Sequence, residues 1–470
     1  MAIQFYLNGE LRREKAIPPT TTVLDYLRTN LGQTGTKEGC AEGDCGACSI
    51  VIVRRSENGN AVYEVVNSCL LIVPQLDGAN VVTVEGLDQD GHMDPVQVDM
   101  VESDGSQCGF CTPGFIMALY ALRQGDEELT DGVIHDALAG NLCRCTGYRP
   151  IVEAAQHACS TATVDEFGRL EPLVSGESYE LGSQKFFAPR NLGKLSDLMA
   201  TYPEAVMLAG GTDLGLRFSK DRDLLPTIIH TSEVSELCTI TETEHYLELG
   251  AAVTYTRALP YIKRLHPSFA TLITRIGSRQ IRNLGTLGGN IGTASPIGDT
   301  LPCLIALDTT LILYSKDGTR ELPLENFFLA YRKTDLKSGE VIKGIRIPKL
   351  KKGQEFRTYK ISKRYDQDIS SVIGAYLLEI ADNKVTHVRI AFGGMAEIPK
   401  RAKACEVAIL EKDWVEETLR EAGSAVASDF NPLSDHRATK DYRLRVAENL
   451  FLRLYRDLNG TEDLLEVVGA

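Results

Sequence analysis

The chain has 470 residues, 43% of them apolar, and a formal net charge of −14. This length can support several hydrophobic cores and predicts three or four domains, while the acidic balance argues against sequence-independent binding to nucleic acid or anionic membranes. The N-terminal stretch MAIQFYLNGELRRE has no apolar core of signal-peptide length, and no run of about 18 apolar residues could span a membrane. We therefore expect a cytoplasmic protein without a membrane partner.

The first part of the chain predicts a small α+β domain over residues 1–86. Residues 3–7 (IQFYL) suit a strand, and the following NGE suits a hairpin turn. Residues 21–31 carry apolar positions at helical spacing after a run of threonines. Further strands are predicted at 49–53 and 79–84.

A helical domain is predicted over residues 87–160. Residues 112–123 (TPGFIMALYALR) have apolar positions at the i, i+3, i+4, i+7 spacing of a helix, with Thr112 as the expected cap and Pro113 in the first turn. Two more helices are predicted at 132–140 and 150–159, the latter opened by Pro150.

The remaining chain predicts a linker and two further α+β domains. Residues 161–184 are polar and rich in Ser, Thr, Glu and Gly, as in linkers. Residues 185–356 are mixed α/β with several glycine pairs, and 357–470 begin with strands at 372–380 and 385–392. Helices are then expected around 400–425 and 439–458.

Twelve cysteines are unusual in a cytosolic protein, where thiols stay reduced and dense cysteine indicates metal binding or catalysis. Eight of them crowd into residues 40–145. The other four are interpreted as ordinary thiols: Cys159, Cys238, Cys303 and Cys405.

The first cysteine set reads CAEGDCGAC at residues 40–48, followed by Cys69. Its C-x4-C-x2-C spacing is that of plant-type [2Fe–2S] ferredoxins, and its glycines allow the loop to bring backbone N–H groups close to a cluster. Zinc sites with repeated C-x2-C pairs have a different spacing. The predicted ligands are Cys40, Cys45, Cys48 and Cys69.

The second set comprises Cys108 and Cys111, then Cys143 and Cys145. Each pair precedes a predicted helix, whose N-terminus favours thiolates. Cys143 and Cys145 would point to opposite faces of a strand, so the chain must turn there. By spacing alone this set fits a zinc site with four cysteine ligands as well as an iron–sulfur cluster.

Two glycine-rich loops follow in the second half, MLAGGTDLG at 207–215 and LGTLGGNIGTASPIGD at 284–299. Both could present N–H groups to a pyrophosphate, although either could be only a tight turn. Neither contains GxGxxG, so a Rossmann dinucleotide site is not supported.

The motifs CAEGDCGAC, SQCGFCTPGF and GNLCRCTGYRPI together resemble the iron–sulfur domains of the xanthine oxidase family of molybdenum hydroxylases. The resemblance implies a second [2Fe–2S] cluster on Cys108, Cys111, Cys143 and Cys145, held in a helical bundle nearer the molybdenum centre. It also implies that Gln107 lies beside the pterin of the molybdenum cofactor. The implied fold is a multidomain α+β chain with a ferredoxin-like domain and an all-α bundle.

The glycine loops resemble the family's FAD-binding domain, of the vanillyl-alcohol oxidase type, followed by a C-terminal α+β flavoprotein domain. By this resemblance Asp299 accepts hydrogen bonds from the ribitol or nearby N–H groups, while Ile276 stands where the family often has an aromatic residue near FAD. Lys360 would lie near the flavin, and Ile342 near the adenine or the ring system. Asp368 belongs to a charged loop, 361–369, that borders an NAD site. The residues implied to cradle the pyrophosphate are Met207, Leu208, Ala209, Gly210, Gly211, Thr212, Asp213, Leu214, Thr286, Leu287, Gly288, Gly289 and Asn290.

Within the family, the chain resembles the iron–sulfur/FAD subunit of two-subunit xanthine dehydrogenases, because the large molybdopterin domains are absent. This implies electron transfer to NAD, or to oxygen as the other acceptor considered, from a molybdopterin-binding large subunit that converts hypoxanthine and xanthine to urate, in an (αβ)2 heterotetramer. No catalytic residue for hydroxylation is expected here. The alternatives are a subunit of a nicotinate, aldehyde or CO hydroxylase, which often split these domains into separate chains, and a free-standing iron–sulfur flavoprotein carrier.

Overall fold

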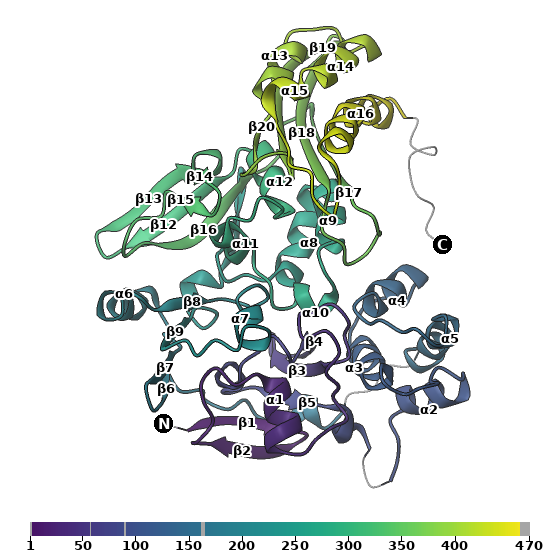
Figure 1. Ribbon diagram of the computed structural model, residues 1–470, viewed down its shortest axis with the longest axis vertical. Helices are drawn as coiled ribbons and strands as arrows, with labels where there is room; N and C mark the ends of the chain where they lie inside the picture. Colours follow the sequence, from purple (N-terminus) through teal and green to yellow (C-terminus); the bar gives the residue numbers. More distant parts are fainter. Residues whose placement is uncertain (1, 57, 89–90, 161–164, 461–470) are drawn as a thin grey trace. The chain divides into compact units, whose positions relative to one another are not determined.

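The computed structural model describes residues 2–56, 58–88, 91–160 and 165–460 and divides into two compact units (Figure 1). The first unit comprises Met1–Ser235, Thr254–Thr256 and Gly277–Thr286. The second unit comprises Glu236–Val253, Arg257–Ile276 and Leu287–Ala470. The predicted domain at 185–356 therefore contributes to both units.

A five-stranded sheet of order β2-β1-β5-β3-β4 begins the first unit. Buried side chains alternate with less buried ones along β1, which confirms the predicted strand at 3–7. The helix predicted at 21–31 is shorter: α1 (Val23–Asp25), capped by Thr22, passes into a π-helical turn at Tyr26–Asn30. The strands are β1 (Ile3–Leu7), β2 (Glu10–Glu14), β3 (Ser49–Arg55), β4 (Ala61–Asn67) and β5 (Asn80–Val82).

Four helices form the second part of this unit: α2 (Pro95–Glu102), α3 (Thr112–Arg123), α4 (Asp131–Leu138) and α5 (Arg149–Ala158). The predicted helix at 112–123 is confirmed and packs against β3 and β4. Its expected cap was wrong, because Cys111 occupies the N-cap position. The Thr112 hydroxyl instead shares a hydrogen bond of 2.7 Å with Ser106 Oγ.

The rest of the first unit is a four-stranded sheet of order β6-β7-β9-β8 with short helices. β6 lies inside the segment predicted as a linker, 161–184, and pairs antiparallel with β7, so the end of that segment is part of the sheet. Residues 161–164 of the predicted linker lie outside the described residues. The elements are β6 (Ser178–Leu181), β7 (Gln184–Phe187), α6 (Leu192–Thr201), β8 (Val206–Leu208), α7 (Gly215–Ser219), β9 (Thr227–His230) and α10 (Arg279–Arg282).

The second unit contains a five-stranded sheet of order β10-β11-β16-β12-β13, with α11 against β16. A short hairpin, β14 (Phe328–Ala330) with β15 (Lys333–Thr334), follows in the chain. The other elements here are β10 (Ile240–Glu242), β11 (Tyr246–Gly250), α8 (Tyr255–Leu265), α9 (Pro267–Thr274), α11 (Leu287–Thr293), α12 (Thr300–Ala306), β12 (Thr310–Ser315), β13 (Gly318–Pro323) and β16 (Val341–Pro348).

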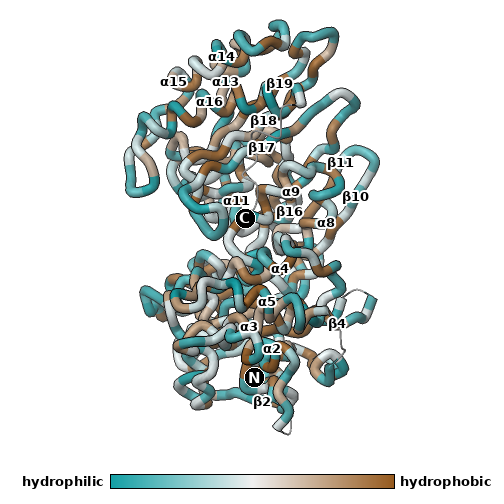
Figure 2. Tube along the Cα trace, turned by 90° about the vertical axis from the view of Figure 1, so that its right-hand side faces the viewer, coloured by the Kyte–Doolittle hydropathy of each residue, from teal (hydrophilic) through white to brown (hydrophobic). Residues whose placement is uncertain are grey.

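A second sheet in this unit, of order β17-β18-β19-β20, packs against C-terminal helices around an aromatic cluster. Tyr376 lies edge-on to both Phe392 and Phe451, with ring centroids 5.8 and 5.5 Å apart. In Figure 2 brown residues concentrate around β17 and β18, while teal ones follow the outer loops. The elements are β17 (Gln354–Ile361), β18 (Val372–Ala381), β19 (Lys384–Gly393), β20 (Lys400–Arg401), α13 (Lys403–Ile409), α14 (Glu416–Ser424), α15 (Val426–Asp429) and α16 (Lys440–Leu458).

None of the helices among the described residues is both long enough and apolar enough to cross a lipid bilayer.

Candidate functional site

The first cysteine loop surrounds the Cys40 sulfur with backbone donors. The N–H groups of Glu42, Asp44 and Cys45 donate to Cys40 Sγ at 3.3 to 3.4 Å. This convergence requires a tightly wound loop, and Gly43 has a left-handed φ of +82°. Such N–H groups stabilise a thiolate, as a metal cluster requires.

The sulfurs of this loop lie in two pairs. Cys40 N–H donates to Cys45 Sγ at 3.3 Å, and Cys48 Sγ lies 3.3 Å from Cys69 Sγ. The side-chain hydrogen bond between the Cys40 and Cys45 thiols is the main cause that lowers the pKa of Cys40 to about 5 and raises that of Cys45. In the second pair the thiol of Cys69 lowers the pKa of Cys48.

The second set has the same paired arrangement. Cys108 interacts with Cys145, and Cys111 with Cys143. The predicted turn at Cys143 and Cys145 is present: Cys145 N–H donates to Cys143 Sγ at 3.4 Å, and Tyr148 has a positive φ of 69°. Tyr148 Oη accepts a hydrogen bond of 3.0 Å from Cys143 N–H, which fixes the loop before α5.

Paired sulfurs suit two iron atoms better than one zinc ion. A single tetrahedral ion brings four ligands around one point, whereas each iron of a [2Fe–2S] cluster takes two protein ligands. The donor set of each loop therefore fits a [2Fe–2S] cluster, and the zinc alternative for the second set is disfavoured.

In the first unit, the predicted pyrophosphate loop runs from β8 into α7 and lies tightly against its neighbours. A Cβ added at Gly210 would lie 1.7 Å from the carbonyl oxygen of Leu284, and one at Gly215 would lie 2.7 Å from that of Leu70. Met207 and Asp213 are exposed, whereas Leu208, Gly210 and Gly211 are buried. Thr286 forms an isolated antiparallel bridge with Thr254.

In the second unit, residues Leu287–Asn290 form the start of α11. Gly288 passes so close to Ala251 that an added Cβ would lie 2.4 Å from its carbonyl oxygen. Asn290 Oδ1 accepts a hydrogen bond of 2.6 Å from Thr300 Oγ1. The close approach permitted by Gly288 is a backbone feature that suits a nucleotide loop.

Asp299 and Lys360, predicted separately, meet in a buried ion pair of the second unit. Lys360 Nζ lies 2.7 Å from Asp299 Oδ2 and donates to the carbonyl of Arg275 at 2.8 Å. The exposed fractions of the Lys360 and Asp299 side chains are only 2% and 10%. Ser370 Oγ donates to the other carboxylate oxygen at 2.8 Å. Sequence reasoning missed Ser370 and Arg275, since no local spacing connects them with Asp299.

The remaining predicted residues are dispersed. Ile276 follows α9, and Ile342 lies on β16 opposite Leu313. Asp368 Oδ2 accepts a hydrogen bond of 2.9 Å from Arg364 N–H, within the charged loop. Gln107 is exposed next to Cys108 in the first unit. Their predicted roles toward FAD, NAD and the pterin stay predictions.

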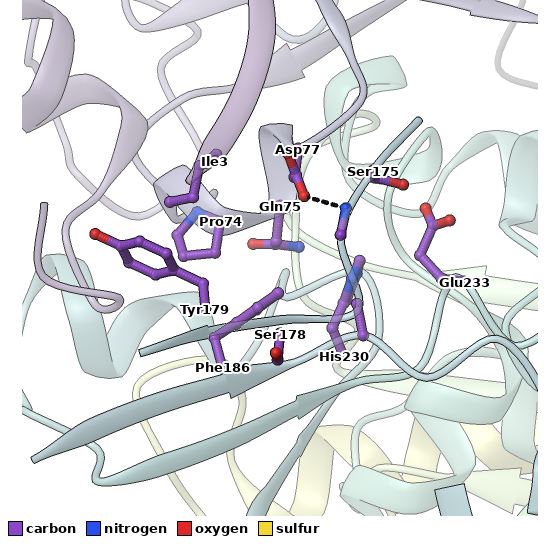
Figure 3. A pocket seen from close by; sticks show the side chains of 12 residues that line it. Ile3, Pro74, Gln75, Asp77, Ser175, Ser178, Tyr179, Phe186, His230 and Glu233 are labelled. Atoms are coloured by element: carbon purple, nitrogen blue, oxygen red, sulfur yellow. Dashed lines mark hydrogen bonds between the residues drawn. The ribbon is translucent and has the colours of Figure 1, made fainter. Parts of the chain in front are cut away.

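A small cavity in the first unit was not predicted (Figure 3). Its volume is about 20 Å³, the room that about one water molecule needs. Asp77 lies at its edge and accepts hydrogen bonds from the N–H groups of Gln4 and Gly176, at 2.7 and 2.6 Å. His230 also lines it, and its ring packs against Phe186 with centroids 5.7 Å apart.

Four domain families match the chain in succession. They are the 2Fe-2S iron-sulfur cluster binding domain (residues 5–73), the [2Fe-2S] binding domain (83–156), the FAD binding domain in molybdopterin dehydrogenase (180–350) and the CO dehydrogenase flavoprotein C-terminal domain (357–458). The chain belongs to the molybdenum hydroxylases. Its resemblance to that family, the multidomain α+β fold, two [2Fe–2S] domains and an FAD-binding domain are thereby confirmed.

This molybdenum hydroxylase chain is 31% identical to the xanthine dehydrogenase of Emericella nidulans over 97% of its own length and 38% of the relative. It is also 31% identical to the xanthine dehydrogenase/oxidase of Gallus gallus, over 99% of this chain and 41% of the relative. The chain therefore spans about two fifths of the length of these relatives.

Two solved structures share part of the fold of this molybdenum hydroxylase chain. A chain of carbon monoxide dehydrogenase from Hydrogenophaga pseudoflava, solved without the Mo-pyranopterin moiety of its cofactor, is 27% identical with a TM-score of 0.55, over 57% of this chain and 94% of its own. A chain of quinoline 2-oxidoreductase from Pseudomonas putida 86 has 24% identity and a TM-score of 0.55, over 61% and 100%.

Proposed function

We propose that the protein is the electron-transfer subunit of a xanthine dehydrogenase. The observation that carries the proposal is the order of two paired four-cysteine sites and an FAD-binding domain in one chain, matched over 97% of its length by a xanthine dehydrogenase. Electrons from a molybdopterin partner would pass through the helical site, then the ferredoxin-like site, then to FAD and NAD. When bound, the clusters supply one-electron carriers and FAD supplies hydride chemistry.

The residues of this chain position and tune those groups. The paired cysteines would hold the irons, and the N–H groups of Glu42 and Asp44 that point at Cys40 Sγ would adjust the charge on the sulfur. The glycine loops at 207–214 and 286–290 would approach the pyrophosphate with their backbone N–H groups. The buried pair of Lys360 and Asp299 would fix β17 and the start of α12 near the flavin.

The molybdopterin domains, on this proposal, come from a separate large subunit in an (αβ)2 cytoplasmic assembly. Support comes from a chain of carbon monoxide dehydrogenase, 94% of which corresponds to 57% of this chain. That chain is almost fully accounted for by the match, so in that enzyme domains like these stand on a chain of their own. We further propose domain boundaries at 1–86, 87–160, 185–356 and 357–470, close to the family matches.

A second candidate keeps the architecture and changes the substrate. The likeness to carbon monoxide dehydrogenase, at 27% identity, favours a hydroxylase that acts on a molecule other than a purine. A free-standing iron–sulfur flavoprotein carrier is a third candidate, in which no molybdenum partner exists.

Purification of the native protein with its partners tests these candidates. The proposal expects a larger molybdopterin-containing subunit and urate production from xanthine with NAD as acceptor. Carbon monoxide or quinoline turnover without urate would select the second candidate, and a pure chain without molybdenum the third. Anaerobic addition of NADH tests the acceptor separately, because a flavin absorbance that does not bleach would argue against an NAD site.

A further inference from the structure

Gln280 is a fully buried glutamine that lies beside both cysteine loops of the first unit. It belongs to α10 and has an exposed fraction of 0%. Its Nε2 donates to Ser49 Oγ at 3.1 Å and to Asn141 Oδ1 at 3.0 Å. Because Ser49 directly follows Cys48 and Asn141 lies two residues before Cys143, one amide group is bonded to both ligand-bearing loops.

Both partners of Gln280 are also bonded to Gly46, inside the first loop. Ser49 Oγ donates to the Gly46 carbonyl at 2.8 Å, and Asn141 Nδ2 donates to the same oxygen at 3.1 Å. Ser49 and Asn141 therefore each donate one hydrogen bond to the Gly46 carbonyl and accept one from Gln280. Only a side chain with two N–H groups at this place can bond both acceptors.

The two loops also contact each other directly at this point. Leu142 N–H donates to the carbonyl oxygen of Cys45 at 3.0 Å. The backbone thus runs from Cys45 across one hydrogen bond to Leu142, whose next neighbour is Cys143. Cys45, a predicted ligand of the first cluster, lies on one side of this hydrogen bond, and Cys143, a predicted ligand of the second, lies next to its other side. A change in how the two loops are arranged would therefore change this hydrogen bond.

The packing around the amide leaves little freedom. A Cβ added at Gly140 would lie 2.0 Å from Gln280 Oε1. That oxygen is buried and has no hydrogen-bond partner within the described residues. An unpaired buried acceptor is destabilising. The two hydrogen bonds that the same amide donates offset this cost in free energy.

The two arginines of α10 form ion pairs away from the cysteine loops. Arg279 pairs with Glu127 at 2.8 Å and with Asp136 at 2.6 Å, and Arg282 pairs with Asp136 at 2.5 Å. These carboxylates lie on α4 and on the segment before it, and not in the cysteine loops. A substitution of Arg279 therefore weakens the attachment of α10 without touching the hydrogen bonds to the cysteine loops, and it serves as a matched control.

We propose that Gln280 is a positioning residue for electron transfer between the two iron–sulfur sites. Its amide holds residues 40–48 and 141–145 in one arrangement and so sets the separation of the clusters that they bind. This inference rests on the proposed function, since electrons pass only between loaded sites. Gln280 lies within the stretch that matches the FAD-binding domain, at 180–350, yet the role proposed for it concerns the iron–sulfur sites.

The test uses the full chain loaded with both clusters and the variant Gln280→Met, which keeps the side-chain volume and removes both donors. Two reduced clusters are paramagnetic and split each other's EPR signals according to their separation. We expect Gln280→Met to keep both signals and to lose the wild-type splitting. Arg279→Met should retain it. Gly140→Ala, which displaces the amide without altering it, should reproduce the effect of Gln280→Met.

Wild-type splitting in Gln280→Met would overturn the inference and leave the proposed function intact. If Gln280→Met fails to retain both clusters, Gly140→Ala decides in the same way: a lost splitting supports the inference and an unchanged one overturns it. A wild-type chain without two iron–sulfur signals would overturn the proposed function and this inference together.

Discussion

At the scale of single residues, the sulfur atoms of each four-cysteine set form two pairs. Cys143 is buried and accepts from Cys145 N–H, while its Sγ lies 3.3 Å from Thr146 Oγ1. A serine there offers a harder, far less acidic ligand than a thiolate. Every cluster ligand should therefore be individually required.

We expect Cys143→Ser to remove one of the two iron–sulfur EPR signals and about half of the bound iron, because the other site uses cysteines of a separate loop. Cys159→Ser is the matched control, since Cys159 belongs to neither four-cysteine set and its Sγ donates to the Leu119 carbonyl at 3.6 Å. Two unchanged signals in Cys143→Ser would show that the ligand assignment is wrong.

His230 gives the stability of the first unit a pH dependence. Burial first, and then the charges of Arg54 and Arg190, lowers its pKa to about 3. The unfolded chain binds this proton near pH 6.5, so stability falls as the pH falls from about 6.5 toward 3. The expected loss from this residue is about 2 kcal/mol at pH 5.

Urea unfolding at pH 7 and pH 5 measures this effect in the wild type and in His230→Leu. The variant should lose less stability between the two pH values. His266, whose pKa burial also lowers, to about 4, contributes equally to both proteins and cancels in the comparison. Equal losses would mean that His230 is protonated in the folded chain.

At the scale of elements, α3 lies close to the first cysteine loop. A Cβ added at Gly114 would lie 2.3 Å from the carbonyl oxygen of Gly46. Alanine normally stabilises a helix relative to glycine by about 0.5–1 kcal/mol. Here the added methyl group would push against a backbone atom that cannot easily move.

We therefore predict that Gly114→Ala destabilises the first unit by about 1–3 kcal/mol, as overpacking does, and lowers the iron content of the ferredoxin-like site. Gly132→Ala on α4 is the control, because its Cβ would meet only Thr130 Oγ1, at 3.9 Å. That variant should unfold at the same or a higher denaturant concentration. A stabilised Gly114→Ala would show that the two elements are not in contact.

At the scale of the whole molecule, the three cofactor domains define how many electrons the chain can store. Each [2Fe–2S] cluster takes one electron and FAD takes two. Anaerobic titration of the loaded chain with dithionite should therefore consume about four electrons for each FAD. An uptake of about three, with one iron–sulfur signal, would mean that one four-cysteine site does not hold a cluster.

The sequence predicted what local spacing determines. The cysteine loops and the helix at 112–123 were recognised because their residues lie within a few positions of one another. The cap was missed because the spacing of Thr112 does not reveal that Ser106 engages its hydroxyl. The ion pair of Lys360 with Asp299 joins residues far apart in the chain, and so do the hydrogen bonds of Gln280. Sequence periodicity does not predict such contacts. Cysteine spacing alone could not distinguish a zinc site from an iron–sulfur cluster for the second set. The pairing of the sulfurs disfavours zinc.

The placement of α10 has a consequence for how such enzymes are assembled from genes. Residues 277–286 belong to the matched FAD-binding domain, at 180–350, yet they are part of the compact unit that contains both cysteine loops. In a single chain the bonds of Gln280 form at the high effective concentration that a covalent tether provides. If the same domains were encoded as separate polypeptides, these hydrogen bonds would become part of a subunit interface. The dissociation constant of that interface would then determine what fraction of the molecules has its two clusters at the separation that Gln280 sets.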